Sequence, residues 1–154
     1  MDISDLLTPE RVIANLHATS KKQALQELAR RAGELTGESE RAVFDVLLER
    51  ERLGTTGVGG GIAIPHGRLA GLSTMFGLFA RLERPVEFES IDERPVDLIF
   101  LLLAPATAGA DHLKALARVS RLLRDRGICE KLRGTDKREA LFALLADSAA
   151  SHAA

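Results

Sequence analysis

The chain has few aromatic residues and almost no cysteine. Its 154 residues include no tryptophan, no tyrosine, six phenylalanines and one cysteine, Cys129. The aromatic platforms on which single-stranded nucleic acids stack are therefore not expected. A single cysteine excludes an internal disulfide framework and fits a reducing compartment. We expect a cytoplasmic protein in which Cys129 is a small packed residue.

An excess of one charge and a long apolar run are also missing. The formal net charge is −1, with basic residues scattered among acids, so electrostatic binding of nucleic acid or of an anionic membrane is not expected. The longest apolar run, Leu98–Pro105, is too short to span a bilayer, and the N-terminus lacks the features of a signal peptide. We expect neither a nucleic-acid partner nor membrane insertion.

Helical patterns occupy both ends of the chain. Apolar residues at helical spacing predict a helix over Ser20–Leu35, begun by a capping box of Ser20 with Gln23. Further helices are predicted over Ser39–Arg52, Asp111–Arg126, Ile128–Leu132 and Asp136–Asp147. Asp111 is the expected N-cap of the helix that extends to Arg126. The small residues of Ser148–Ala154 predict a frayed tail.

Strand patterns fill the middle of the chain. Arg11–Leu16 is predicted to be a short strand or an extended entry to the domain. A short strand is predicted over Ile62–Ile64, longer ones over Thr74–Leu82 and Val96–Ala104, and an edge strand over Val86–Phe88. The run from Val96 is apolar on both sides, which predicts a central strand covered on both faces. Because helices precede and follow the strands, we predict a single α/β domain with its sheet between helical layers.

A glycine-rich stretch separates the second predicted helix from the short strand before His66. Its glycines fit neither a P-loop nor a dinucleotide fingerprint. Closely spaced glycines allow a backbone to approach a ligand or to present N–H groups to an anion. Candidate phosphate-binding residues are therefore Thr55, Thr56, Gly59, Gly60 and Gly61. A plain turn, with the threonines capping it, is the alternative.

His66 follows the stiff Pro65 and precedes Gly67, which leaves its imidazole accessible. A neutral imidazole is nucleophilic near neutral pH and can attack phosphorus without a separate base. Phosphoryl transfer then needs mainly positioning and donors around the phosphoryl oxygens. A lone histidine is more often an ordinary surface or core residue, so its neighbours decide between these alternatives.

Two other residues can supply donors to a phosphate. Arg50 is either part of a salt-bridged helix end or a fork of N–H groups directed at phosphate. His112 is either an exposed first-turn residue or a group at a helix N-terminus, where an anion is favoured. Spacing alone does not pair His112 with His66. Motifs of zinc peptidases, serine hydrolases and dithiol proteins are missing from the sequence.

The segments Arg50–Gly57 and Gly61–Gly67 resemble the mannitol/fructose-type enzyme IIA domain of the bacterial phosphotransferase system, most closely the nitrogen-related enzyme IIA. Pro95–Phe100 and Asp111–Leu113 fit the same pattern. The resemblance implies a mixed sheet flanked by helices, with residues 1–147 forming the enzyme IIA domain and 148–154 the tail. It also implies that a small histidine phosphocarrier protein phosphorylates His66. In this resemblance, His112 is the supporting histidine and Arg50 lines the pocket, whereas Gly60 replaces a common asparagine.

Two functions remain open at this stage. The protein can be a regulatory protein whose phosphorylation switches its contacts with target proteins, or a sugar-specific subunit that passes phosphate to an enzyme IIB. A free-standing module is more typical of the regulatory branch. We expect no cofactor and no metal. Leu53, Leu69 and Leu72 flank His66 in the sequence and are expected to form part of a docking face.

Overall fold

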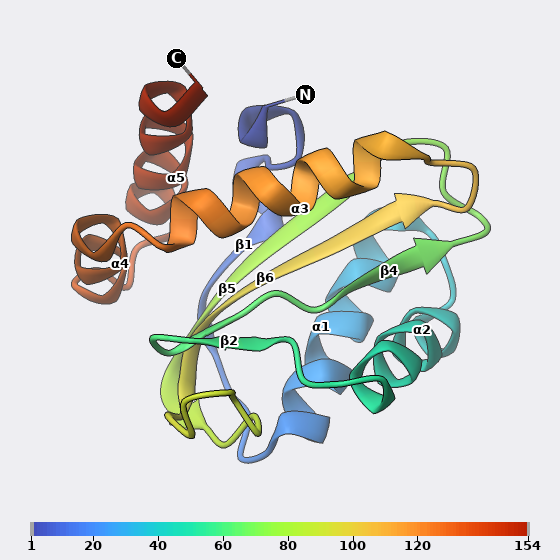
Figure 1. Ribbon diagram of the computed structural model, residues 1–154, viewed down its shortest axis with the longest axis horizontal. Coiled ribbons are helices and arrows are strands. Elements are labelled where there is room, and N and C mark those ends of the chain that lie inside the picture. The colour runs from blue at the N-terminus through green and yellow to red at the C-terminus, as the bar shows by residue number, and fades with distance from the viewer. Residues whose placement is uncertain (1, 154) are drawn as a thin grey trace.

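The protein, described here by a computed structural model, has a six-stranded mixed sheet with helices on both faces (Figure 1). The structure describes the backbone of residues 2–153 and the side chains of residues 2–148. This arrangement confirms the predicted α/β fold and its helical layers. None of the helices within residues 2–153 is long and apolar enough to cross a membrane.

The strands are β1 (Val12–Leu16), β2 (Gly57–Gly59), β3 (Ile62–Ala63), β4 (His66–Leu69), β5 (Phe76–Val86) and β6 (Val96–Pro105). Their order in the sheet is β1-β5-β6-β3-β2, and β4 also pairs with β6, beyond the end of β3. Parallel pairs join β1 to β5 and both β3 and β4 to β6, whereas β5–β6 and β2–β3 are antiparallel. The central place predicted for the Val96 strand is confirmed.

Alternate side chains of β6 enter two separate apolar cores. Leu98, Phe100 and Leu102 pack with the three C-terminal helices on one face, whereas Leu101 and Leu103 pack with the first two helices of the chain on the other. All of these side chains are fully buried. The period of two residues in a strand therefore explains why an unbroken apolar run is needed here.

The first helical layer follows its sequence signals. Helix α1 (Lys21–Thr36) has Ser20 as its N-cap, and the side chain of Ser20 accepts a hydrogen bond from the backbone N–H of Gln23. Its C-cap is Gly37, which has a φ of 80°. Helix α2 (Glu40–Arg52) has Ser39 as its N-cap, and the side chain of Ser39 accepts a hydrogen bond from the backbone N–H of Ala42. Both helices start and end within about one residue of the prediction.

The second layer differs from the prediction at its helix boundaries. It contains α3 (Ala110–Leu123), α4 (Arg126–Arg133) and α5 (Arg138–Ala153). The prediction of one helix as far as Arg126 was wrong, because Asp125 interrupts it and accepts from the N–H of Ile128 as N-cap of α4. The N-cap of α3 is Gly109, so Asp111 lies inside the helix. The tail expected to fray from Ser148 lies in the last turns of α5 as far as Ala153, and its fraying stays a prediction.

Two further differences concern strands. The predicted edge strand Val86–Phe88 was wrong: Val86 ends β5, where it pairs with Val96, and Phe88 is fully buried outside any strand. A shift in register between Arg81 and Val86 accommodates Pro85, which has no N–H for the ladder. Strand β4, which begins at His66, was not predicted, because Pro65 and Gly67 hide its pattern.

Candidate active site

The register of β4 directs His66 and Gly67 to opposite faces of the sheet. His66 lies beside Leu102 of β6, on the face covered by α3, and Gly67 lies beside Leu103, on the face covered by α2. A β-carbon at position 67 would lie 2.3 Å from a methyl group of Val46. Glycine therefore lets α2 pack directly on the strand that carries the histidine. This close packing explains how Arg50, near the end of α2, reaches His66.

The hydrogen bonds of His66 determine which of its nitrogens carries the proton. Its Nδ1 lies 2.8 Å from the carbonyl oxygen of Ile64. A carbonyl oxygen can only accept, so Nδ1 carries the hydrogen and Nε2 keeps a lone pair. Arg50 Nε donates to that Nε2 over 3.3 Å, and Arg50 Nη1 donates to the carbonyl of Gly54 over 2.8 Å. A nucleophilic nitrogen and a guanidinium therefore face each other.

His112 lies beside His66, as a resemblance to enzyme IIA domains requires. The two rings are 5.7 Å apart between centroids and stand at 83° to each other. His112 is in the first turn of α3 and is only 8% exposed, so it is not the exposed first-turn residue of the alternative hypothesis. Arg68 Nε lies 3.5 Å from its Nδ1, which places the hydrogen of a neutral His112 on Nε2. That Nε2 is buried and has no hydrogen-bond partner among the described residues.

Arg68 is the site residue that the sequence analysis missed. It occupies β4 two positions after His66, beside Ala104, and therefore on the same face as His66. The available signal was this spacing, because residues two apart in a strand share a face. Without a predicted strand at His66, the signal was not usable.

A buried ion pair supports the segment behind His66. Glu51 has only 4% of its side chain exposed, and its carboxylate lies 2.9 Å from Lys21 Nζ. Both the N–H and the hydroxyl of Thr56 donate to this carboxylate. The carbonyl of Thr56 in turn accepts from the N–H of Ile64, whose own carbonyl holds His66. The ion pair and the hydrogen bonds that follow it therefore connect Lys21 of α1 with the Nδ1 hydrogen of His66, and so help to fix the tautomer of that ring.

The glycine-rich stretch forms a hairpin away from the histidines. Gly59, Gly60 and Gly61 have φ values of 101°, 66° and 81°, and they connect β2 to β3. The N–H of Gly60 donates to Asp92, and the carbonyl of Gly61 accepts from the N–H of Asp97 at the start of β6. His66 lies beside Leu102, about 16 Å further along that strand. The structure therefore does not bring these three glycines to His66, and the requirement for a left-handed turn accounts for them.

The two threonines have partners within the protein. The hydroxyl of Thr55 donates to the carbonyl of Phe88, and that of Thr56 donates to Glu51. These contacts favour the alternative in which the threonines hold the loop.

Of the leucines expected at a docking face, Leu69 is only 5% exposed and belongs to the core, so that expectation was wrong for it. Leu53 and Leu113, which is next to His112, are 84% and 69% exposed.

Burial lowers the pKa of both histidines, and this predicts a pH dependence of stability. For His66, burial is the main cause; the bond to Ile64 opposes it, and Arg50 adds to the lowering. For His112, burial is again first, followed by the charges of His66 and Arg68. A pKa below the unfolded value of about 6.5 means that the unfolded chain takes up protons first. Their stabilising contribution is therefore complete above about pH 6.5 and is lost as the pH falls below it.

We expect the urea midpoint to decrease between pH 7.5 and pH 5.5. The variant His66→Gln/His112→Gln should show a smaller decrease over the same interval, because its site no longer excludes a proton. Equal decreases in both proteins would contradict a contribution from these histidines.

Three comparisons show which known proteins this chain resembles in sequence and fold. The model of the family "Phosphoenolpyruvate-dependent sugar phosphotransferase system, EIIA 2" matches residues 5–148. A nitrogen regulatory protein of Bradyrhizobium diazoefficiens is 63% identical over 146 residues, which are 95% of each chain. A fructose-specific EIIA component of Haloferax volcanii is 35% identical over 153 residues, covering 96% of this chain and 98% of the other.

Among solved structures, the nitrogen regulatory protein IIA-Ntr of Neisseria meningitidis superposes with a TM-score of 0.87. It is 36% identical, and the match covers 93% of this chain and 98% of the other. The sequence match over nearly the whole length and the agreement in fold lead to one assignment: this chain belongs to the EIIA 2 family of the phosphoenolpyruvate-dependent sugar phosphotransferase system.

Proposed function

We propose that His66 accepts a phosphoryl group on Nε2 from a small histidine phosphocarrier protein, and that the protein acts as a nitrogen-related regulator. The observation that carries the first part is the hydrogen bond from His66 Nδ1 to the carbonyl of Ile64. It keeps the Nε2 lone pair available without any proton transfer. The regulatory part rests on the likeness to the nitrogen regulatory proteins over nearly their full lengths.

The transfer step balances without an external base. The Nε2 lone pair of His66 attacks the phosphorus of the donor's phosphohistidine, and an N–P bond forms as the donor's N–P bond breaks. The donor imidazole leaves with the electron pair of the broken bond. The hydrogen of His66 stays on Nδ1 throughout and is donated to the carbonyl of Ile64. The phosphorylated ring of His66 is then a cation, as the donor's phosphohistidine ring was before the transfer, and the negative charge that needs stabilising lies on the phosphoryl oxygens.

Three side chains around Nε2 can stabilise that charge. Arg50 already donates a hydrogen bond to Nε2, and its guanidinium can reorient so that its N–H groups donate to the phosphoryl oxygens. Arg68 brings a second guanidinium to the same face, through its contact with His112. The unpartnered Nε2–H of His112 is a buried donor that a phosphoryl oxygen would satisfy. Fixed donors of this kind act in place of a metal ion.

Incubation of the protein with phosphorylated donor should yield one acid-labile phosphoryl group per chain. Phosphorus–nitrogen coupling in the ¹⁵N-histidine-labelled protein should place it on Nε2. Transfer should continue in excess chelator. Phosphorylation on Nδ1 would contradict the tautomer inferred from the contact with Ile64, and a stable, unlabelled protein would contradict the proposed function.

Arg50→Ala and His112→Ala are each expected to slow phosphorylation about 10–100-fold. A hydrogen bond to a charged group is worth about 1.5–3 kcal/mol, and a loss of this size in the transition state gives that factor. Single-turnover labelling with purified donor measures the rate. Arg52→Ala is the matched control, because Arg52 is an exposed arginine of the same helix whose partner is Glu49. Rates equal to the control in both variants would contradict their role.

The regulatory hypothesis and the transport hypothesis differ in what happens after phosphorylation. Phosphate would add about −1.5 to −2 charges beside the exposed Leu53 and Leu113, and so would repel a partner that docks there with acidic or apolar groups. We expect affinity capture with unmodified and phosphorylated protein to yield different partners. The likeness to a fructose-specific component favours the alternative of transfer to an enzyme IIB. Identical partners, together with rapid loss of phosphate to an enzyme IIB, would support that alternative.

A further inference from the structure

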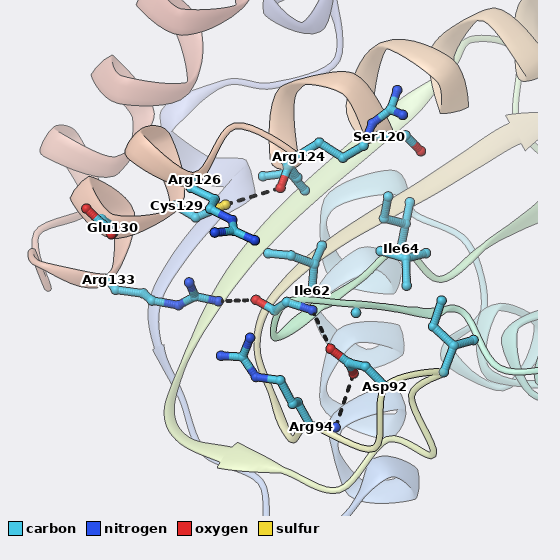
Figure 2. A pocket seen from close by; sticks show the side chains of 15 residues that line it. Ile62, Ile64, Asp92, Arg94, Ser120, Arg124, Arg126, Cys129, Glu130 and Arg133 are labelled. Atoms are coloured by element: carbon cyan, nitrogen blue, oxygen red, sulfur yellow. Dashed lines mark hydrogen bonds between the residues drawn. The ribbon is translucent and has the colours of Figure 1, made fainter.

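A cavity lies away from the histidines, between the β2–β3 hairpin and helices α3 and α4. Its volume is about 830 Å³, within the range of small-molecule sites. Figure 2 shows the side chains that line it. Neither His66, His112, Arg50 nor Arg68 is among them. The cavity is therefore not part of the candidate active site.

The inner wall of this cavity is apolar. Ile62 of β3, Ile64 just after that strand and Leu123 at the end of α3 are nearly fully buried and form this wall. Val58 and Ile91 stand at the rim and are 49% and 76% exposed. Large apolar side chains at a rim are costly to leave in water, and they would be covered by the apolar part of a ligand.

The mouth of the cavity carries a positive charge. Arg94, Arg124, Arg126 and Arg133 line it, against the acids Asp92 and Glu130. In Figure 2 the side chains of Arg94, Arg126 and Arg133 extend toward one another from the β5–β6 loop and from both ends of α4. Like charges gathered at one place favour a bound anion.

Only one of these arginines has a structural role among the described residues. Arg133 forms two hydrogen bonds with Asp97 and donates to the carbonyl of Gly60. The ion pairs within residues 2–148 include neither Arg94 nor Arg126. The carboxylate of Asp92 is engaged by the backbone N–H groups of Gly60 and Arg94. The guanidinium groups of Arg94 and Arg126 are therefore available to a ligand.

We propose that this cavity binds a small organic anion, with a carboxylate, phosphate or sulfonate head held by Arg94 and Arg126 and an apolar body against Ile62, Ile64 and Leu123. A guanidinium matches such a head group with two parallel N–H donors. The apolar wall adds affinity by area removed from water. A bare inorganic anion lacks the body and binds weakly.

The test uses the full chain and anilinonaphthalene sulfonate, whose fluorescence rises on binding. The chain contains no tryptophan or tyrosine, so intrinsic emission does not interfere. We expect saturable binding at one site, displaced by octanoate but not by sodium chloride at the same ionic strength. Arg94→Gln/Arg126→Gln should weaken binding about 10-fold or more.

The matched control is Arg41→Gln/Arg52→Gln, which removes the same charge from exposed arginines of α2. It should bind the probe within about twofold of wild type, and both double variants should still accept phosphate on His66. Amide shifts in ¹H–¹⁵N spectra should be confined to residues 58–64, 91–94 and 120–133. Non-saturable binding, equal affinity in the two double variants or shifts centred elsewhere would each overturn the proposal. The binding and spectral measurements, which decide the proposal, do not depend on the proposed phosphorylation.

Discussion

Replacement of His66 by alanine is expected to abolish phosphorylation, with no labelled protein at any donor concentration. Among the side chains of residues 2–148, this variant lacks the one imidazole whose Nε2 faces Arg50 and whose other nitrogen is held by a backbone carbonyl. His112 cannot substitute, because it is 8% exposed and Arg68 donates to its Nδ1. The expected loss is complete rather than partial, because the acceptor atom itself is removed.

Labelling with phosphorylated donor, followed by mass spectrometry of the intact protein, measures this loss. His17→Ala is the matched control, because His17 is a histidine with 80% of its side chain exposed and a contact only with Glu83. It should be labelled like wild type. Circular dichroism should show the same helix content in all three proteins. Stoichiometric labelling of His66→Ala would mean that another residue is the acceptor.

The second large effect is expected at Glu51, where Glu51→Gln should lower the free energy of unfolding by about 3 kcal/mol. Removal of one partner of a buried ion pair costs about 3–5 kcal/mol, because the other charge remains buried. Lys21, with 16% of its side chain exposed, keeps a 3.4 Å contact with Glu89, which favours the lower end of that range. The amide can also accept at only one oxygen, whereas both carboxylate oxygens accept from Thr56.

In a domain of this size, the change corresponds to a decrease in Tm of about 6–12 °C. Glu49→Gln provides the control on the same helix, since Glu49 has 70% of its side chain exposed and pairs with Arg52 at the surface. Such exposed pairs contribute about 0–1 kcal/mol. If Glu51→Gln melted within 2 °C of Glu49→Gln, the buried pair would not support the segment behind His66.

The residue pattern was sufficient to predict the helices of the first layer and the central strand. Ser20, Ser39 and Gly37 mark helix ends through local hydrogen bonds and a left-handed φ, and these depend on near neighbours in the chain. The run in β6 is apolar on both sides because two cores need it. Such signals are local, so the sequence contains them in full.

The sequence was least informative where the chain is irregular. Strand β4 has four residues and contains Gly67, and its pairing partner β6 is distant in the sequence. Periodicity cannot show such a strand, and the same-face position of Arg68 was missed with it. The glycines at 59–61 show the converse, since one composition suits a phosphate loop and a tight hairpin equally well. The contact of Gly60 with Asp92 favours the hairpin.

The sequence by itself predicted a reactive context for His66, because Pro65 and Gly67 are contiguous with it and the motif around Arg50 is one loop away. Only the tertiary structure decided that Arg50, Arg68 and His112 surround it. Arg50 comes from one helical layer and His112 from the other, and they meet at His66, where β4 begins. The tautomer of His66, and the gathering of arginines around the cavity beside α4, likewise depend on atoms brought close together by folding. Spacing along a chain does not encode such contacts, because pairing between β4 and β6 and the packing of α2 and α3 bring them about together.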